Sequence, residues 1–518
     1  MRPRVLAAVS LLTSIPIGLA LPMDRSTALA QSLPPVELPE DTDQQQLGSV
    51  RNLQLEVFVN GAATDLIAEF RQETDGSLAI DPVQLSNVGI APAEQALRPD
   101  GLIALSRLSN VSYEVDEVSQ NIRFTVSYDA ISTRVIEAHT PDTEVRKAQS
   151  AVGGLVNYTI YASTGGNGIE DMWAFEGVSG WLEGRVFSPL GVVSHSQIVS
   201  SSPNETYDST RLDTTWSYSN PQAMITYRAG DLISGGLSWT RPIRLGGVQV
   251  QRNFGLRPDL VTMPLPELSG SAAVPSTVDV YVNNARRLSQ EIRPGPFEIS
   301  DLPVVTGSGT ARVVVRDALG RQTVTETPFF ASSELLAPGL WDFSAEGGLA
   351  RRLYGIESND YDDRFIASGS VRYGLNDWLT LEGHAEGGGG LLNGGAGAVF
   401  GIGHYGVGSF AAAASTYQGY TGYQIAGSVE LELGDVHLYG RTQRTFGDYL
   451  DIAAITAERP LLPDFDFRTA APPRSLDQVS VSVPLNFDPS IFNVSYTQLE
   501  TAEGDQSRML GLSYTRPV

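Results

Sequence analysis

Apolar and polar residues alternate along much of the chain, as in β-strands whose two faces meet different surroundings. The clearest case lies in the last third, where Leu379, Leu381 and Ala385 fall on one face of a predicted strand and Thr380, Glu382, His384 and Glu386 on the other. Similar runs of about ten residues recur from Trp341 to Val518 and from about Leu155 to Met263. The pattern predicts two long β-rich regions, at residues 150–263 and 335–518.

Two architectures fit this alternation: a sandwich with one solvated face, and a barrel whose interior is wet. A meander this long would leave a very wide sheet with exposed edges, whereas closure into a barrel removes the edges. At roughly 14 to 15 residues per strand and turn, these regions predict a barrel of about 20 strands. Aromatic residues near the predicted strand ends suit a membrane interface, although soluble sandwiches also bury aromatics; they include Tyr158, Trp181, Trp216, Tyr227 and Trp239.

Two smaller β-type units are predicted outside the barrel regions. In residues 51–140, Leu55, Val57 and Val59 alternate before an Asn-Gly turn, which indicates a small globular domain. Residues 264–332 are richer in Val and Pro, and Pro294-Gly295-Pro296 marks a rigid bend. We expect this second unit to be a compact β-sandwich inserted between the two barrel regions.

The N-terminus resembles an export signal. Arg2 and Arg4 precede an apolar stretch at residues 5–21, and Ala28-Leu29-Ala30 supplies a small-x-small cleavage site, so residues 1–30 are predicted to be a signal peptide. Residues 31–50 are rich in Pro, Gln and acidic residues and form a predicted flexible leader. Its scattered apolar residues are compatible with a passive tether or with folding onto a partner.

The composition argues against several kinds of chemistry. The chain has no Cys, which excludes a disulfide framework and thiol catalysis, and its net charge of -24 argues against binding nucleic acid. Its five histidines show no metal-ligand spacing, and the G-x-G-x-x-G match at residues 401–406 lies in a glycine-rich β region without a following helical pattern. We therefore expect no enzyme, no catalytic residue, no metal and no cofactor.

The block from Tyr227 to Arg352 resembles the centre of fimbrial outer membrane ushers of the chaperone–usher pathway. The matching motifs occur in order: Gly230-Asp231, Gly247-Val248-Gln249, Leu256-Arg257-Pro258-Asp259 and, most specifically, Pro294-Gly295-Pro296-Phe297. Residues 55–90 are in turn similar to the usher's periplasmic N-terminal domain. The resemblance implies an all-β fold: a large transmembrane β-barrel with an inserted β-sandwich plug domain at residues 264–332 and a small periplasmic N-terminal domain at residues 51–140.

The resemblance also implies a function without bond chemistry. An usher of this kind receives chaperone-bound pilus subunits, assembles them and secretes them through its pore, in the outer membrane of a Gram-negative cell. The implied partners are periplasmic chaperone–subunit complexes, fimbrial subunits, outer membrane lipid and, as a further candidate, a second usher copy. By this carry-over, Leu33, Val36 and Leu38 are candidate chaperone-binding residues, and Pro294, Gly295, Pro296 and Phe297 belong to the plug that gates the pore.

One departure from the family concerns the end of the chain. Ushers usually continue past the barrel into periplasmic C-terminal domains, and these we expect to be absent, since this chain stops at Val518. It is interpreted as a fragment or as a member of a short branch. The alternatives are a general outer membrane porin or export barrel, an inactive usher fragment and a secreted β-rich adhesin.

Overall fold

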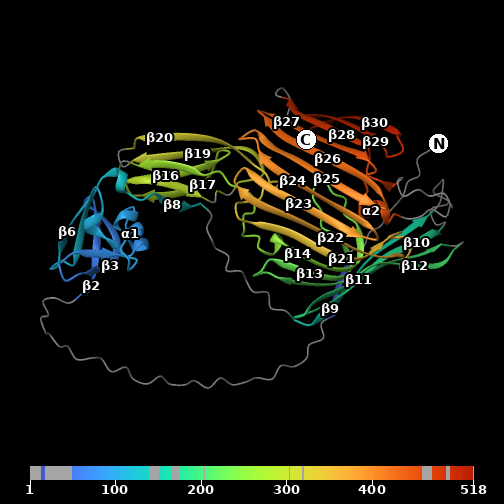
Figure 1. Cartoon of the computed structure of the whole chain (residues 1–518), viewed down its shortest axis with the longest axis horizontal. Coiled ribbons are helices and arrows are strands. Elements are labelled where there is room, and N and C mark those ends of the chain that lie inside the picture. Colours follow the sequence, from blue (N-terminus) through green and yellow to red (C-terminus); the bar gives the residue numbers. More distant parts are fainter. Residues whose placement is uncertain are drawn as a thin grey trace, which may run out of the picture.

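The computed structural model describes residues 13–17, 50–138, 151–164, 175–202, 205–272, 274–300, 302, 304–317, 320–457, 470–485 and 490–516. β-Strands account for most of these residues (Figure 1). Among them, no helix has both the length and the apolar character needed to cross a membrane. The all-β fold class predicted from the alternation is confirmed.

The first unit, here called the N-terminal domain, is a six-stranded sheet in the order β5-β4-β3-β2-β7-β6 with one short helix. Its apolar core includes Val57, Phe70, Leu85 and Phe124, each 1% exposed or less. Asp81 caps the helix by accepting hydrogen bonds from the next turn. The elements are β2 (Arg51–Val59), β3 (Ala62–Gln72), β4 (Leu78–Ile80), α1 (Pro82–Asn87), β5 (Ile103–Ala104), β6 (Val111–Asp116) and β7 (Asn121–Val126).

The second unit, here called the insert, folds from residues 264–332. A four-stranded sheet in the order β17-β16-β19-β20 packs on a three-stranded sheet in the order β15-β18-β8, where β8 is Arg134–Glu137, and the two share one apolar core. Asn283 and Asn284 both have positive φ angles, as a two-residue hairpin turn requires. The strands are β15 (Leu268–Ala272), β16 (Ser276–Val282), β17 (Ala285–Ile292), β18 (Gly295–Ser300), β19 (Gly307–Asp317) and β20 (Gln322–Ala331).

One strand of the insert comes from outside it. β8 (Arg134–Glu137) falls within the range predicted for the N-terminal domain, but it pairs in parallel with β18 of the insert. The sequence-based placement of residues 134–137 is therefore wrong, because the apolar side chain of Ile136 is buried in the core of the insert.

The remaining strands form the barrel. In the part of the chain that the structure describes, sixteen strands from β9 to β30 follow one another as antiparallel neighbours, and the insert lies between β14 and β21. They are β9 (Gly153–Thr164), β10 (Phe175–Ser188), β11 (Gly191–Ser202), β12 (Glu205–Asn220), β13 (Ile225–Ile233), β14 (Arg244–Arg252), β21 (Trp341–Arg351), β22 (Tyr361–Asn376), β23 (Leu379–Gly388), β24 (Leu391–Gly401), β25 (Gly406–Tyr417), β26 (Tyr420–Leu433), β27 (Val436–Gly447), β28 (Ser475–Leu485), β29 (Ser490–Glu500) and β30 (Gln506–Thr515).

The seam of the barrel lies between its first and last strands. β9 pairs with β10 along one edge, and all ten residues of β30, the last described strand, are exposed. β1 (Thr13–Ile17) pairs antiparallel with β9. The residues of β1 are the only described residues of the predicted signal peptide, and cleavage of that peptide stays a prediction.

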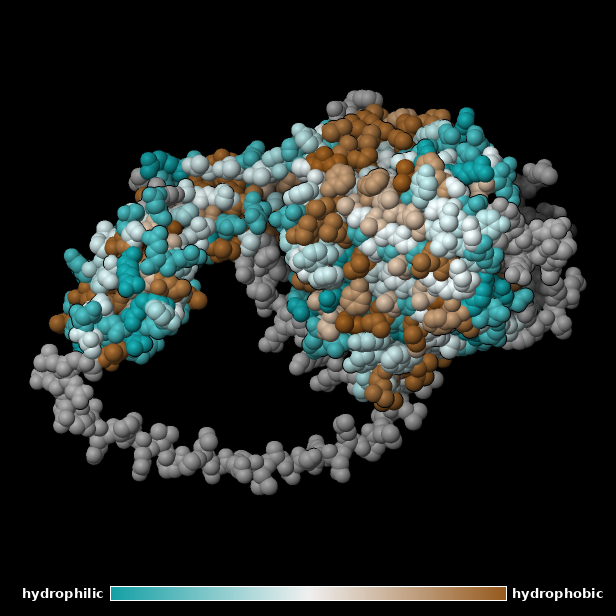
Figure 2. Space-filling model, viewed as in Figure 1, coloured by the Kyte–Doolittle hydropathy of each residue, from teal (hydrophilic) through white to brown (hydrophobic). Residues whose placement is uncertain are grey.

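The barrel is polar inside and apolar outside, which decides between the two architectures left open by the alternation. On β23, Thr380 is 0% exposed and Glu382 is 8% exposed, whereas Leu381, on the other face, is 42% exposed. Figure 2 shows brown and tan, apolar residues interspersed with near-white ones over the barrel strands that face the viewer. A soluble sandwich would bury the opposite set, so the arrangement is that of a membrane barrel.

One expectation about the barrel needs correction. The estimate of about 20 strands is higher than the sixteen described, because longer connections such as residues 234–243 and 352–360 take up chain that the estimate had given to strands. The G-x-G-x-x-G match at residues 401–406 is a tight turn between β24 and β25, in which Ile402 donates its backbone N–H to the Gly406 carbonyl. A strand follows it, so the segment lacks the helix of a nucleotide-binding unit.

Candidate functional site

The two ends of the barrel differ in their connections. At one end, short turns join β12 to β13, β22 to β23, β24 to β25 and β26 to β27, and the insert enters there as well. At the other end, longer segments join β13 to β14, β21 to β22 and β27 to β28, although two-residue turns join β23 to β24 and β25 to β26. Bacterial outer membrane barrels have short periplasmic turns and longer external loops. The insert and the N-terminal domain therefore lie at the end that matches the periplasmic side (Figure 1).

The segment between β13 and β14 folds into the barrel, where Trp239 is 5% exposed. Its indole Nε1 donates to Glu382 Oε2 at 3.0 Å, and Gln424 Nε2 donates to the Trp239 carbonyl at 2.8 Å. Arg441 donates to the Ser238 carbonyl at 2.8 Å. Because these partners lie on β23, β26 and β27, residues 234–243 reach across the interior and cover part of the polar wall.

The segment after β27 folds into the same interior. It carries α2 (Ile452–Ile455), whose first turn is capped by Asp451. The backbone N–H of Ile452 donates to Glu386 Oε1 at 2.9 Å, and Asn393 Nδ2 donates to the Tyr449 hydroxyl at 3.1 Å. Burial raises the pKa of Tyr449, so its hydroxyl stays protonated at neutral pH.

An ion pair joins the two infolded segments. Arg241 Nε donates to Asp451 Oδ2 at 2.6 Å, and a second guanidinium nitrogen of Arg241 pairs with the other carboxylate oxygen of Asp451. The same side chain donates to the Ala470 carbonyl at 3.1 Å. A bidentate pair of this kind fixes the geometry as well as the distance, so it holds residues 234–243 and 448–457 together.

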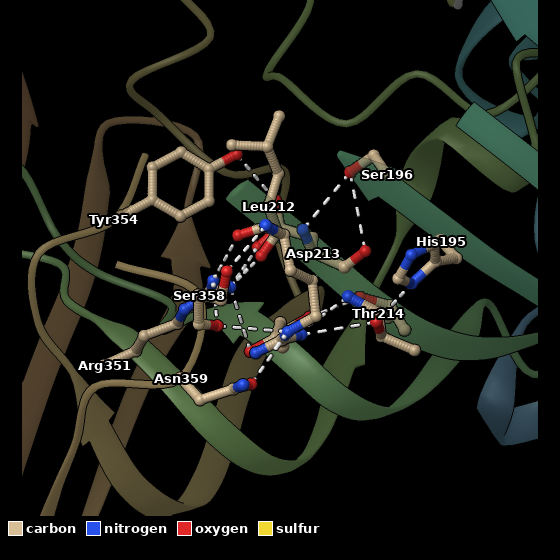
Figure 3. A network of polar contacts seen from close by, with 12 residues as sticks. His195, Ser196, Leu212, Asp213, Thr214, Arg351, Tyr354, Ser358 and Asn359 are labelled. Carbon is tan, nitrogen blue, oxygen red and sulfur yellow. Dashed lines mark hydrogen bonds and ion pairs between the residues drawn. The ribbon is translucent and has the colours of Figure 1, made fainter. Parts of the chain in front are cut away.

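A charged network fastens the connection between β21 and β22 to the wall (Figure 3). At its centre, the side chain of Arg351 is 0% exposed and lies 3.2 Å from Asp231 and 3.3 Å from Asp213. Arg351 also donates to the Ser358 carbonyl at 3.1 Å, which ties down the connecting segment. The Tyr354 hydroxyl donates to Asp213 at 3.0 Å, and the pKa of Tyr354 is raised, chiefly by burial and then by this hydrogen bond.

The insert touches the rim of the barrel through a carboxylate. The backbone N–H of Ser308 donates to Glu432 Oε2 at 2.8 Å, and Glu432 closes the strand β26 at the end that carries the insert. His437 lies 3.8 Å from the same carboxylate. The insert therefore sits beside the barrel mouth in this structure, not within the polar interior.

The N-terminal domain carries a groove lined by residues of β2, β3, β4 and α1, among them Val50, Glu69, Arg71 and Gln84. The candidate chaperone-binding residues Leu33, Val36 and Leu38 lie outside the described residues. Val50, the last residue of the predicted leader, borders this groove. The predicted leader therefore joins the N-terminal domain beside this groove.

The Pro294–Phe297 motif lies at the start of β18. Pro294 precedes the strand, Gly295 begins it, and the Phe297 ring, 1% exposed, lies in the insert's core. The described histidines stay apart: His195 contacts Thr214, His384 contacts Ser370, His404 packs on Tyr405, and His437 lies near Glu430. Within the described ranges, no group of three potential ligand side chains could hold a metal ion.

Several residues of the interior were not found by sequence reasoning. Trp239 was grouped with aromatics at a membrane interface, but it lies inside the barrel. The sequence around Trp239 could have indicated this position, because Gly235, Gly236 and Pro242 interrupt the alternation of apolar and polar residues that a strand shows. Arg351 and Asp213 gave no signal, because a single charge in an alternating strand also fits an ordinary wet face.

Comparison with known proteins adds the family. Residues 229–429, which run from β13 through the insert to β26, match the model of the outer membrane usher protein family. The central part of the chain is an outer membrane usher domain. The usher domain thus includes both the polar wall that contacts Trp239 and the inserted unit that carries the Pro-Gly-Pro-Phe motif.

The relatives of the usher domain match over limited stretches. The outer membrane usher protein YehB of Escherichia coli (strain K12) is 28% identical over 162 residues, which is 31% of this chain and 19% of that protein. FaeD of Escherichia coli is 32% identical over 165 residues, 31% of this chain and 19% of that usher. The matched part therefore spans about a fifth of the length of these relatives.

A solved structure shares the fold over a longer range. The cryo-EM structure of the Escherichia coli P pilus tip assembly intermediate PapC-PapD-PapK-PapG is similar over 91% of this chain and 60% of that chain, with a TM-score of 0.54 and 16% sequence identity. At this identity the likeness concerns the fold. It extends the similarity beyond the usher domain, to most of the chain.

Proposed function

We propose that this protein is an outer membrane usher that receives chaperone-bound pilus subunits, assembles them and secretes them through its barrel. The supporting observation is topological. The N-terminal domain and the insert both lie at the short-turn end of a barrel with a polar interior (Figure 1). A porin-type barrel has no need of two additional β-domains at its periplasmic mouth.

Transport by such an usher needs no catalytic group in the chain. A pilus subunit would be polymerised by donor-strand exchange, in which an extended segment of one subunit replaces the chaperone's strand in another. Main-chain hydrogen bonds and side-chain pockets then supply the driving force. In this proposal the chain binds the chaperone–subunit complexes, aligns the subunits and conducts them through the barrel. The segments 234–243 and 448–457 have to leave the interior before a folded subunit passes.

The recruitment site in this proposal combines the leader and the groove. Leu33, Val36 and Leu38 would contact the chaperone, and the leader reaches the N-terminal domain at Val50, beside the groove. Apolar residues presented by an unfolded segment bind by ordering on the partner's surface. The plug motif Pro294–Phe297 would act at a later step, when the insert sets access to the barrel.

A pull-down with purified chaperone–subunit complex tests this proposal. The export-competent chain is compared with the triple variant Leu33→Ser, Val36→Ser, Leu38→Ser and with the control Val118→Ser. Val118 is also apolar and is 96% exposed, but it lies in the turn between β6 and β7. We expect the triple variant to bind about tenfold more weakly or worse, as for the loss of interface anchors, and the control to bind like the native chain.

Each outcome has a distinct meaning. Equal binding by the triple variant and the native chain would remove the leader from the recruitment site. Absence of binding by every form, in protein shown to reach the outer membrane, would favour a porin-type barrel or an inactive usher fragment.

A further inference from the structure

The pairing of β8 with β18 joins two parts of the chain that are distant in sequence. Arg134 to Glu137 lie in register with Phe297 to Ser300, and the backbone N–H of Ala138 continues the ladder by donating to the Ser300 carbonyl at 2.9 Å. β18 already pairs with β15 on its other side. Without β8, β18 would be an open edge of a two-stranded sheet, which is marginal in water.

The same strand completes the core of the insert. Ile136 is 3% exposed and packs in one cluster with Phe297, Ile299 and Val280, while its neighbour Val135 points outward and is 58% exposed. Burial of alternate residues is the signature of a true sheet strand. The insert therefore takes both a backbone ladder and a core side chain from the segment before the barrel.

The chain just before β8 is fixed to the N-terminal domain. Ile131 forms a β-bridge with Ile90 and packs against that domain's core. On the insert's side, a Cβ added to Gly295 would lie 2.9 Å from the Ile131 side chain, so the glycine of the Pro-Gly-Pro-Phe motif permits this approach. Arg293 also donates to the Thr64 carbonyl of the N-terminal domain. Only residues 132 and 133 separate the bridge residue from β8.

We infer that residues 134–138 are a donated strand that completes the insert and makes the N-terminal domain and the insert move as one body. A motion that takes the insert towards or away from the barrel mouth then carries the N-terminal domain with it. Peeling β8 from β18 is the step that uncouples them. This inference does not depend on what the protein transports.

Distance measurements between spin labels test it, and the chain has no native Cys to interfere. Labels at Val118→Cys and Val324→Cys, both exposed, report between the N-terminal domain and the insert. We expect one narrow distance distribution in the full-length chain. Ile136→Asp, which places a charge in the insert's core, should broaden it at least about twofold. Val135→Asp, on the exposed face of the same strand, should leave it narrow.

Two control pairs separate uncoupling from unfolding. Labels at Val305 and Val324 report within the insert, and labels at Val83 and Val118 within the N-terminal domain; all four residues are exposed. These distributions should stay narrow in every variant. A broad distribution between the domains of the native chain, or an unchanged one in Ile136→Asp, would overturn the inference.

A second measurement avoids a disruptive substitution. Val135 and Glu298 are register partners, so the pair Val135→Cys, Glu298→Cys should form a disulfide on mild oxidation, whereas Val135→Cys, Val324→Cys should not. If Ile136→Asp unfolds the insert, this crosslink still tests whether β8 pairs with β18. Its failure to form in the folded chain would show that β8 is not donated.

Discussion

The single buried charge of Arg351 connects neighbouring strands of the barrel. Its guanidinium is fully buried and lies between the carboxylates of Asp213 and Asp231, while it also donates to the Ser358 carbonyl of the β21–β22 connection and to two carbonyls of β12. Burying a charge costs less when the charge is paired and hydrogen-bonded, as both terminal nitrogens of Arg351 are, although its buried Nε has no hydrogen-bond partner among the described residues. The side chain thus links β12, β13 and β21 with the segment that follows β21.

Replacing Arg351 by Met should destabilise the barrel by about 3 to 5 kcal/mol, because two carboxylates lose a buried partner. The neighbouring Arg352 pairs with Asp360 in a more exposed setting, so Arg352→Met is a matched control and should cost about 1 kcal/mol or less. Guanidinium unfolding in detergent, followed by tryptophan fluorescence, measures both. Equal midpoints for the two variants would contradict the importance of the Arg351 network.

Residue patterns predicted which side chains share a face of a strand, but not which of the two faces is buried. The alternation placed Leu381 and Glu382 on opposite faces, but it could not say which face was buried, since a soluble sandwich and a membrane barrel share the period. The position of Trp239 was predicted wrongly for a related reason. An aromatic residue near a strand end is common at a membrane interface, and only the fold of residues 234–243 turns this side chain towards the barrel interior.

Among the elements, the two infolded segments control how much of the interior is open. Residues 234–243 and 448–457 cover the polar wall and meet at the Arg241–Asp451 pair. Neither segment belongs to a strand, so each can move without breaking the barrel's hydrogen-bond ladders.

Arg241→Met should therefore raise ion conductance through the barrel, because it releases one covering segment from the other. Arg257→Met is the control, since Arg257 pairs with Asp259 outside the barrel strands. Single-channel recording in planar bilayers measures both variants. Conductance of Arg241→Met equal to that of the native chain would mean that the ion pair does not restrain the covering segments.

Sequence reasoning predicted the elements unevenly, for physical reasons. Residues 55–59 and 379–386 were predicted as strands because apolar and polar residues alternate regularly in them. β8 was assigned to the wrong unit, because a four-residue strand carries no information about which distant strand it pairs with. The leader's proposed contacts stay a prediction.

At the scale of the whole molecule, a barrel with an apolar outer face should tolerate a charge far less well on that face than on its inner face. Val479 in the middle of β28 is 44% exposed on the apolar face, and Gln478 beside it faces the other way. Val479→Arg should cost about 2 to 4 kcal/mol in a lipid bilayer, whereas Gln478→Arg should cost about 1 kcal/mol or less. Folding titrations into phospholipid vesicles compare them, and a larger cost for Gln478→Arg would reverse the assignment of faces.

The donated strand also has a consequence for the order of folding. β8 precedes the first six barrel strands and β18 follows them, so the hydrogen bonds between β8 and β18 close one large loop of the chain that contains β9 to β14. Closing a loop of that length carries an entropic cost that local hairpins do not have. The insert is then expected to reach its final form late, after the hairpins on both sides, and a chain interrupted within β9–β14 would leave the N-terminal domain beside an insert that it can no longer complete by an intramolecular route.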